Sequence, residues 1–273
     1  MVSPVSRRRA VNHLLACGCT RVCACRVTGL SKHASRYVPK ERNPELREKV
    51  VALAAANPRY GFRRVHALLP GVNVKAVHRI WKHEGLRIRR RARKRFRVTR
   101  SPQPLLSAPN QAWCLDFTHD RLENGRQARI LGVLDCFTRE NLLLKARPSF
   151  PSFQVQEELE WLFLVHGRPE RLVSDNGPEF RALQVSVEQK FIQPGKPWQN
   201  GYIESFFGKL RDELLSCEYF NCGSELQTAL DDFQEHYNNE RPHLGLNGLT
   251  PARFKEKSLV RAEHNSEEAI VGV

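Results

Sequence analysis

The sequence contains no long apolar run, no secretory leader and no phosphate-binding loop of the Walker type. No stretch approaches the roughly 20 apolar residues that a membrane-spanning helix needs. Near the start, Arg7-Arg8-Arg9 are followed only by a short apolar patch interrupted by cysteine. There is no Gly-Lys-Ser/Thr loop to hold ATP phosphates. We therefore expect a soluble cytoplasmic protein with no membrane partner and no ATP site.

Spacings typical of zinc fingers are also missing, although the chain has 8 cysteines. Without a secretory signal, we expect these cysteines to be reduced thiols. Four of them, Cys17, Cys19, Cys23 and Cys25, form the pattern C-x-C-x3-C-x-C. Structural zinc sites usually separate paired ligands by two to four residues. The pattern therefore favours small apolar residues in a helical module, with a zinc site as the alternative.

The positive charge is concentrated in the first 100 residues, which hold 26 Lys+Arg against 4 Asp+Glu. The remaining residues hold 18 basic and 25 acidic side chains. A basic end of this kind, without a long amphipathic apolar face, favours nucleic acid as the partner. The densest run spans residues 86–100, and we predict that its clustered cations contact DNA phosphates: Arg89, Arg90, Arg91, Arg93, Lys94 and Arg95.

Helical periodicity and proline-rich breaks divide the chain into five predicted parts. Residues 1–38 predict a helix-turn-helix-like module, and residues 39–85 a second helical DNA-binding module. Residues 86–110 form a basic and proline-rich linker. Residues 111–255 form the catalytic core, and residues 256–273 a C-terminal tail.

Within the core, strands come first and then alternate with helices. Strands are predicted at 111–117, 128–135 and 141–146, close enough together to form an antiparallel meander. A helix at 153–165, strands at 171–174 and 190–193, and helices at 198–215 and 225–237 follow. This order predicts an α/β fold with a mixed sheet and helical layers, preceded by small all-α modules.

Three acidic residues stand out in this core. Asp116 lies among apolar neighbours in a strand, Asp175 ends a strand, and Glu204 lies in the first turns of a helix. Carboxylate oxygens with few histidines or cysteines nearby suit Mg²⁺ or Mn²⁺, and two such ions catalyse phosphodiester transfer. Ordinary structural roles stay open at this point: Asp116 as a partner of Arg129, Asp175 as a turn residue, and Glu204 as a surface acid pairing with Lys209 or Arg211.

Many ordered segments resemble bacterial insertion-sequence transposases of the downstream-reading-frame type, which have a retroviral-integrase-like core. The resemblance implies a ribonuclease-H-like fold and a D-D-E triad of Asp116, Asp175 and Glu204. It covers roughly residues 6–255 and is carried by these core segments: 113–117, 133–140, 166–169, 174–180, 191–197, 199–206, 237–243 and 249–252.

The same resemblance implies two Mg²⁺ or Mn²⁺ ions, cleavage that frees a DNA 3′ end, and joining of that end to target DNA. It implies that Asn176 and Gly177 shape the turn after the second acid, and that Lys196, Asn200 and Arg211 line the DNA path. The implied partners are DNA (element ends and target), the upstream-frame helix-turn-helix protein of the same element, and further copies of the chain on DNA. The implied location is the bacterial cytoplasm, at the nucleoid.

Three departures from the family pattern are visible. Asp175 and Glu204 are 29 positions apart, about seven residues or two helical turns short, and we expect the helix before the Phe191 strand to be cut to a stub. The second helical module is shortened around residues 69–72. Phe207 stands where the family leads us to expect Asn, which predicts a less polar site. The alternative to an active transposase is therefore an impaired relic that only binds DNA. A nuclease unrelated to transposition fits the acids but not the helix-turn-helix segments.

Overall fold

The computed structural model describes residues 3–37, 43–87, 106–193 and 197–271. The chain divides into two compact units, Met1–Lys49 and Val50–Val273. Among the described residues, no helix has the length and apolar character needed to cross a membrane.

Three short helices form the N-terminal unit: α1 (Pro4–Ala16), α2 (Arg21–Thr28) and α3 (Lys32–Arg36). The side chains of Ser3, Thr20 and Ser31 accept from main-chain N–H groups in the first turn of each helix. Val11, Ala24 and Cys25 form the small core. Across the described residues no group of three His, Cys, Asp or Glu is placed to hold a metal. Cys23 and Cys25 lie in α2, with Cys25 buried, whereas Cys17 and Cys19 follow the end of α1.

A second set of helices comprises α4 (Pro44–Ala56), α5 (Phe62–Ala67) and α6 (Val74–His83). Asn73 caps α6, because its Oδ1 accepts from the N–H of Lys75. Helix α5 has 6 residues, and its C-cap is Leu68. Gly71 then has a positive φ of 76° within the following turn.

Five strands form one mixed sheet in the order β3-β2-β1-β4-β5. The strands are β1 (Trp113–Arg121), β2 (Gln127–Asp135), β3 (Asn141–Arg147), β4 (Arg171–Ser174) and β5 (Glu188–Phe191). The first three pair antiparallel, while β4 pairs parallel to both β1 and β5. The predicted meander and the predicted α/β class with a mixed sheet are therefore confirmed.

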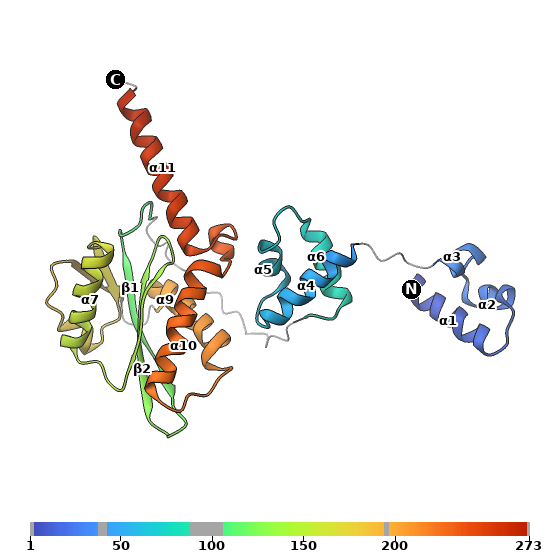
Figure 1. The fold of residues 1–273 in the computed structure, drawn as a ribbon, viewed down its shortest axis with the longest axis horizontal. Helices are drawn as coiled ribbons and strands as arrows, with labels where there is room; N and C mark the ends of the chain where they lie inside the picture. The colour runs from blue at the N-terminus through green and yellow to red at the C-terminus, as the bar shows by residue number, and fades with distance from the viewer. Residues whose placement is uncertain (1–2, 38–42, 88–105, 194–196, 272–273) are drawn as a thin grey trace. The chain divides into compact units, whose positions relative to one another are not determined.

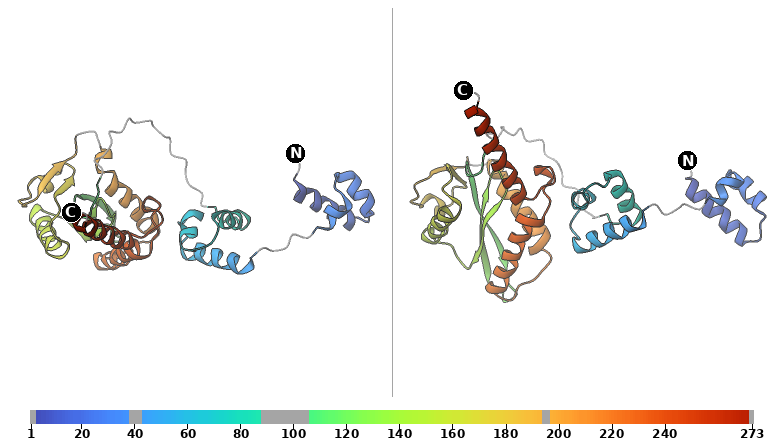
Figure 2. Two further views of the ribbon diagram at one scale, coloured as in Figure 1. Left: turned by 90° about the horizontal axis from the view of Figure 1, so that it is seen from above. Right: turned by 45° about the horizontal axis from the view of Figure 1, so that its top comes forward.

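Helices cover both faces of this sheet. The yellow-green helix α7 (Ser152–His166) lies on one face, and the orange helices α9 (Gly201–Leu210) and α10 (Gly223–Glu235) lie on the other (Figures 1 and 2). Strand β1 divides its side chains between two cores, because neighbouring residues point to opposite faces. Trp113 and Leu115 pack in the α7 core, whereas Cys114 packs in the α9–α10 core.

The segment after Asp175 is the shortest part of the core, as expected from the reduced spacing. Helix α8 (Pro178–Arg181) has 4 residues and is followed by β5. The single helix predicted over 198–215 is instead a 3₁₀ turn (Pro197–Asn200), then α9, then a π-helical turn (Arg211–Leu215). Helix α11 (Pro251–Val271) was not predicted, and it extends beyond the sheet to the C-terminus (Figure 1).

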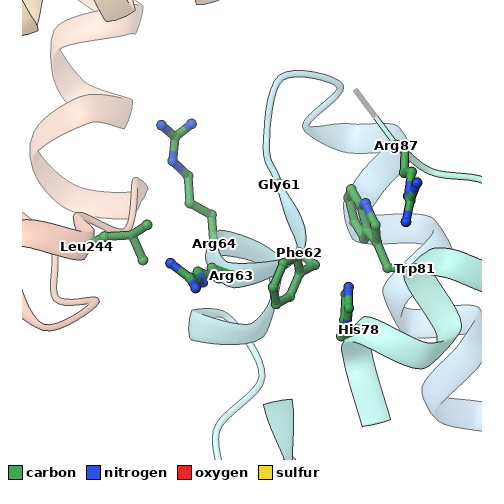
Figure 3. Close-up of a pocket in the computed structure, with 8 residues that line it drawn as sticks. All are labelled: Gly61, Phe62, Arg63, Arg64, His78, Trp81, Arg87 and Leu244. Atoms are coloured by element: carbon green, nitrogen blue, oxygen red, sulfur yellow. The ribbon is translucent and has the colours of Figure 1, made fainter. Parts of the chain in front are cut away.

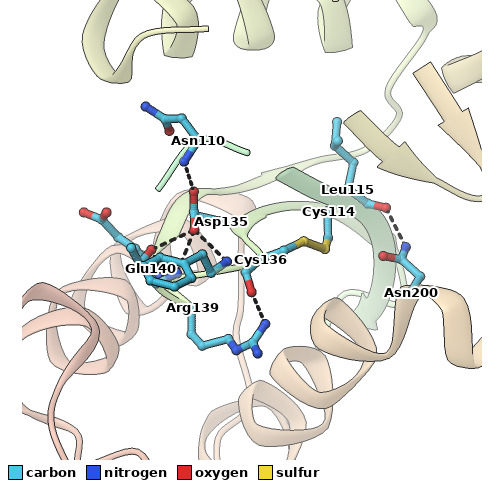
Figure 4. Close-up of a disulfide and its surroundings, with 10 residues drawn as sticks. Asn110, Cys114, Leu115, Asp135, Cys136, Arg139, Glu140 and Asn200 are labelled. Atoms are coloured by element: carbon cyan, nitrogen blue, oxygen red, sulfur yellow. Dashed lines mark hydrogen bonds between the residues drawn. A yellow bond between two sulfur atoms is a disulfide. The ribbon is translucent and has the colours of Figure 1, made fainter. Parts of the chain in front are cut away.

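Cys114 and Cys136 form a disulfide, so the expectation that all cysteines are reduced thiols was wrong for this pair (Figure 4). Cys114 pairs with Leu134 across β1 and β2, which brings Cys136 close and gives a Cα–Cα distance of 6.2 Å. Both cysteines are buried. Sequence spacing did not reveal the pair, because strand register and not composition brings the two residues together.

Candidate active site

Asp116 lies in the middle of β1, directly opposite Gly132 of β2. Its Oδ1 accepts from the N–H of Phe117 at 2.7 Å. Burial raises the pKa of the Asp116 carboxyl to about 6, and the nearby charges of Asp175 and Glu204 raise it further, while the Phe117 N–H and Arg129 oppose the shift. Asp175 and Glu204 therefore both act electrostatically on Asp116.

Asp175 directly follows β4, whose Val173 pairs with Cys114 of β1, so it comes at the end of the strand parallel to the one that carries Asp116. The Gly177 N–H donates to Asp175 Oδ1 at 3.0 Å, and the Asn176 amide donates to the Ile192 carbonyl beyond β5 at 2.7 Å. These bonds give Asn176 and Gly177 the turn-shaping role that the resemblance implied. A Cβ at Gly177 would lie 3.1 Å from Asp175 Oδ1, so the close approach favours glycine.

Glu204 lies in the first turn of α9 with an exposed side chain, while its neighbour Ile203 is fully buried in the core below. Two cations were possible partners on sequence grounds. In the structure Lys209 donates to Ser205, and Arg211 donates to Thr118. Glu204 thus stands at the surface above β1 and β2.

Arg129 does not form the ion pair with Asp116 that the sequence left open. Its guanidinium is bonded to Glu179 of α8 and lies over the Phe117 ring, 3.8 Å from the centroid. This bond and the Arg129 charge act against burial and leave the pKa of Glu179 lowered. Sequence analysis missed Glu179, although its position four residues after Asp175 was an available signal.

Asn200 is 3% exposed, and its amide donates to the Leu115 carbonyl at 3.0 Å (Figure 4). Arg211 is exposed and also donates to Thr118 Oγ1 at 2.7 Å. The other predicted DNA-contact residues lie outside the described residues, and their roles stay predictions: Arg89, Arg90, Arg91, Arg93, Lys94, Arg95 and Lys196.

Phe207 faces the sheet and is 8% exposed, whereas Glu204, three residues earlier on α9, is exposed. It lies over Gly132, where an added Cβ would be 2.7 Å from the phenyl Cζ. An apolar ring thus packs against the strand position opposite Asp116, which contributes to the desolvated setting of that carboxyl.

A pocket is lined mainly by residues in and next to α5 and α6 (Figure 3). The rings of Phe62 and His78 are 4.5 Å apart there. Aromatic surfaces next to arginines are typical of nucleic-acid-binding modules. The lining comprises Gly61, Phe62, Arg63, Arg64, His78, Trp81, Arg87 and Leu244.

Comparisons with known proteins identify the class of this core. A family model described as an integrase core domain matches residues 107–197, and a second model with the same description matches residues 185–251. The part of the chain that forms the mixed sheet and helices α7 to α10 is thus an integrase core domain.

Relatives across the whole chain identify the family. An uncharacterized 31.7 kDa protein of insertion element IS407 from Burkholderia multivorans is 36% identical over 254 residues, covering 88% of this chain and 92% of the relative. The 39.2 kDa protein of IS476 from Xanthomonas euvesicatoria is 35% identical, covering 97% and 81%. The putative transposase InsK of IS150 from Escherichia coli is 30% identical, covering 73% and 78%. The chain belongs to the insertion-sequence transposases with an integrase core, and it is a polynucleotidyl transferase that acts on DNA.

One solved structure with which this chain aligns is a simian T-cell lymphotropic virus intasome in complex with a regulatory subunit of PP2A. The alignment has a TM-score of 0.44 and 18% identity, and it covers 71% of this chain and 70% of that one. Another is the HTLV-2 integrase catalytic core in complex with magnesium, with a TM-score of 0.43 and 18% identity over 54% of this chain and 97% of that one.

Proposed function

We propose that Asp116, Asp175 and Glu204 form the D-D-E triad of this transposase and hold two Mg²⁺ or Mn²⁺ ions for DNA cleavage and strand transfer. The observation that carries the proposal is the position of Asp116. It is a largely buried strand carboxylate whose pKa is raised by the charges of Asp175 and Glu204 as well as by burial. Repulsion among carboxylates is relieved when a divalent cation binds them.

The donor set fits the proposed ions, because three carboxylates offer the hard oxygen ligands that Mg²⁺ and Mn²⁺ prefer. Within residues 3–37, 43–87, 106–193 and 197–271, no group of three such side chains is placed closely enough to hold a metal ion. Asp116 would hold ions from β1, Asp175 from the turn after β4, and Glu204 would complete the set from α9. Bound ions would activate the attacking hydroxyl and stabilise the leaving oxygen.

The chain's own residues prepare this site in two ways. Gly177 fixes one oxygen of Asp175 through its N–H, and Phe117 does the same for Asp116. Arg129, bonded to Glu179, keeps a positive charge near Asp116 and lowers its pKa against the effect of burial. These contacts orient the carboxylates and do not move protons in the reaction.

The proposal extends to the partners of the enzyme. The basic run at 86–100 would follow the phosphates of element ends and target DNA. Strand transfer needs two ends held together, which favours a homo-oligomer on DNA. The upstream-frame helix-turn-helix protein of the same element would join this assembly, in the bacterial cytoplasm at the nucleoid.

Cleavage and joining of an element end by the purified full chain tests the triad. With Mg²⁺ or Mn²⁺, the parent should nick and join labelled DNA carrying the flanking repeat of its element. Asp175→Asn should bind that DNA normally and cut it at a rate lower by about 10³ or more. Asp120→Asn, the same change on β1, is the matched control and should keep parental activity. Normal cleavage by Asp175→Asn would refute the triad.

A DNA-binding relic without strand transfer is the second candidate. It is favoured by the four-residue α8 and by the incomplete ligand group. It predicts that the parent binds element ends tightly but gives no cleaved or joined product with either metal. Product formation that depends on Mn²⁺ or Mg²⁺ would eliminate this candidate.

A further inference from the structure

Contacts from one segment of the chain, Asn200 to Arg211, surround Asp116 on β1. The Asn200 amide bonds the carbonyl of the residue before Asp116, and Arg211 bonds the hydroxyl of Thr118, two residues after it. Phe207 packs on Gly132, the residue opposite Asp116 in the neighbouring strand. In the sequence, Glu204 follows Asn200 and precedes Phe207 and Arg211, the three residues that make these contacts.

Asn200 combines deep burial with an incomplete set of hydrogen bonds. It is 3% exposed, and its Nδ2 donates to the Leu115 carbonyl at 3.0 Å. Its Oδ1 is buried and has no partner among the residues that the structure describes. A buried unpaired carbonyl destabilises the fold, whereas an apolar side chain of similar size would not. The hydrogen bond from the Asn200 amide to the Leu115 carbonyl therefore explains the asparagine better than packing does.

Gly132 lets α9 lie unusually close to the sheet. A Cβ at this position would be 2.7 and 2.9 Å from two ring atoms of Phe207 and 3.4 Å from Ile203 Cδ1. Real Cβ atoms do not approach other atoms at the two shorter distances, so any side chain here would move the helix or the ring.

The short segment between Asp175 and Glu204 makes these contacts more important. Among the described residues in that interval, regular structure is limited to the four-residue α8, the four-residue β5 and the 3₁₀ turn that leads into α9. Little packed structure therefore connects the second acid to the helix that carries the third. The direct contacts from α9 to β1 and β2 must define where Glu204 stands.

We propose that Asn200 is a positioning residue for the transposase reaction. Through the Leu115 carbonyl it fixes the register of α9 on β1, and so the position of Glu204 relative to Asp116, with the Phe207–Gly132 contact as the second fixed point. The inference rests on the proposed triad, and it replaces for Asn200 the DNA contact that the resemblance implied. Arg211 supports the same register while its exposed side chain stays available to DNA.

The test separates metal binding, DNA binding and turnover in the full-length protein. Asn200→Asp keeps the side-chain shape but removes the donor, and Asn200→Ala removes the side chain. For both, Mn²⁺ affinity measured by titration calorimetry without DNA should fall about 10- to 100-fold, as for other residues that orient metal ligands. The turnover rate should fall similarly, and the Kd for element-end DNA should stay within about twofold of the parent.

Asn141→Ala is the matched control. Asn141 is also buried, donates through Nδ2 to the Val133 and Leu143 carbonyls, and has an unpartnered Oδ1 among the described residues, but it lies on β3. It should lower the melting temperature and leave Mn²⁺ affinity unchanged at temperatures where the protein is folded. Equal losses of Mn²⁺ affinity in Asn141→Ala and Asn200→Ala would show a general structural role and overturn the proposal.

A weakened DNA Kd with unchanged Mn²⁺ affinity in Asn200→Asp would also overturn the proposal, in favour of a DNA contact. If both Asn200 variants fail to fold, Gly132→Ala tests the proposal instead. The added Cβ should displace the Phe207 ring and cause the same loss of Mn²⁺ affinity. Parental Mn²⁺ affinity in a folded Gly132→Ala protein would then refute the inference. Cleavage by Asp175→Asn would refute the triad itself, whatever the Asn200 variants do.

Discussion

The two faces of β1 differ in what they are made to do. On the α7 face, Trp113 and Leu115 are buried among aliphatic and aromatic side chains. On the α9 face, the same strand presents a cysteine in a disulfide, a carboxylate and a buried hydroxyl: Cys114, Asp116 and Thr118. Alternation of side chains in one strand thus separates packing from chemistry by a single residue.

The comparison also shows two ways of attaching a helix to a sheet. Helix α7 is held by apolar side chains such as Val155, Leu159 and Leu162. The segment at α9 adds a bond to a main-chain carbonyl, a bond to a hydroxyl and a contact that needs a glycine. Helix α7 also has a directional contact, the ion pair of Glu158 with Arg147 of β3, but the α9 segment places its directional contacts on both sides of Asp116, where the proposed triad needs them.

The largest effect is expected from Asp116→Asn on the chemical face. Cleavage should fall by about 10³ or more. Stability should rise, because the folded-state pKa of Asp116 is about 6 against an ordinary value of 3.8. Since the pKa is raised, the ionised group costs stability above pH 6 and the cost fades as the pH falls below 4, so the gain should be about 3 kcal/mol at pH 8 and less than about 1 kcal/mol at pH 4. Urea unfolding at both pH values measures this, and a destabilised variant at pH 8 would contradict it.

On the packing face, Leu115→Ala should behave in the opposite way. Leu115 is 1% exposed, so the substitution should cost about 3 kcal/mol in the free energy of unfolding. The main-chain carbonyl that Asn200 uses is retained, so the turnover rate of the folded protein at low temperature should stay within about threefold of the parent. Leu164→Ala, at an 86% exposed position of α7, is the control and should change stability by less than about 0.5 kcal/mol. Loss of turnover in folded Leu115→Ala would show that the two faces are not separable.

Buried ionisable groups behind α9 and α10 predict acid sensitivity of that side. His243 packs edge-on against Tyr237, and burial together with the charges of Arg241 and Lys209 lowers its pKa to about 3. In the unfolded chain this histidine takes up a proton near pH 6.5, whereas in the folded protein it stays neutral until the pH is close to 3. The protein is therefore most stable above pH 6.5, and its stability falls as the pH drops toward 3. Between pH 6.5 and pH 5, the free energy of unfolding of His243→Phe should fall by about 2 kcal/mol less than that of the parent. His119→Phe, at an exposed site of β1, should keep the parental slope, and a parental slope in His243→Phe would contradict the assignment.

Two glycine substitutions give the smallest and most direct comparison. Gly208→Ala in α9 meets nothing within 4 Å and should stabilise the protein by about 0.5–1 kcal/mol, because glycine is a poor helix former. Gly132→Ala should destabilise it by about 1–3 kcal/mol, because the Cβ would overlap Phe207. Thermal unfolding of the pair gives the sign of each change. Equal signs would show that α9 is not held tightly on β2.

Local signals predicted most of the elements, because their causes are local. Helix α2 begins after the capping Thr20 and ends at Gly29, as a start and a stop signal require. The alternating and apolar runs placed β1, β2 and β3 within a few residues of their bounds. Helix α11 was missed, although Pro251 at its first position and the run after it favour a helix.

The site could be predicted only in part. The three acids were assigned to a triad because the segments around them resemble those of the family, and that assignment stays a prediction. The ion pair of Arg129 with Glu179, the disulfide and the bond from Asn200 to the Leu115 carbonyl depend on which strands and helices become neighbours. Asn200 shows the limit clearly, because the same residue type in the same segment suits either a DNA-lining position or a buried one, and only the fold decides.

Gly132 has a genetic consequence. Any missense mutation at this codon adds at least a Cβ atom beneath Phe207, so no amino-acid replacement there is neutral for the seating of α9. The basic run at 86–100 is untouched by such a mutation. We predict that a mutant copy of the element produces a protein that binds DNA ends through this run without processing them, and that its allele acts as a dominant inhibitor of intact copies in the same cell.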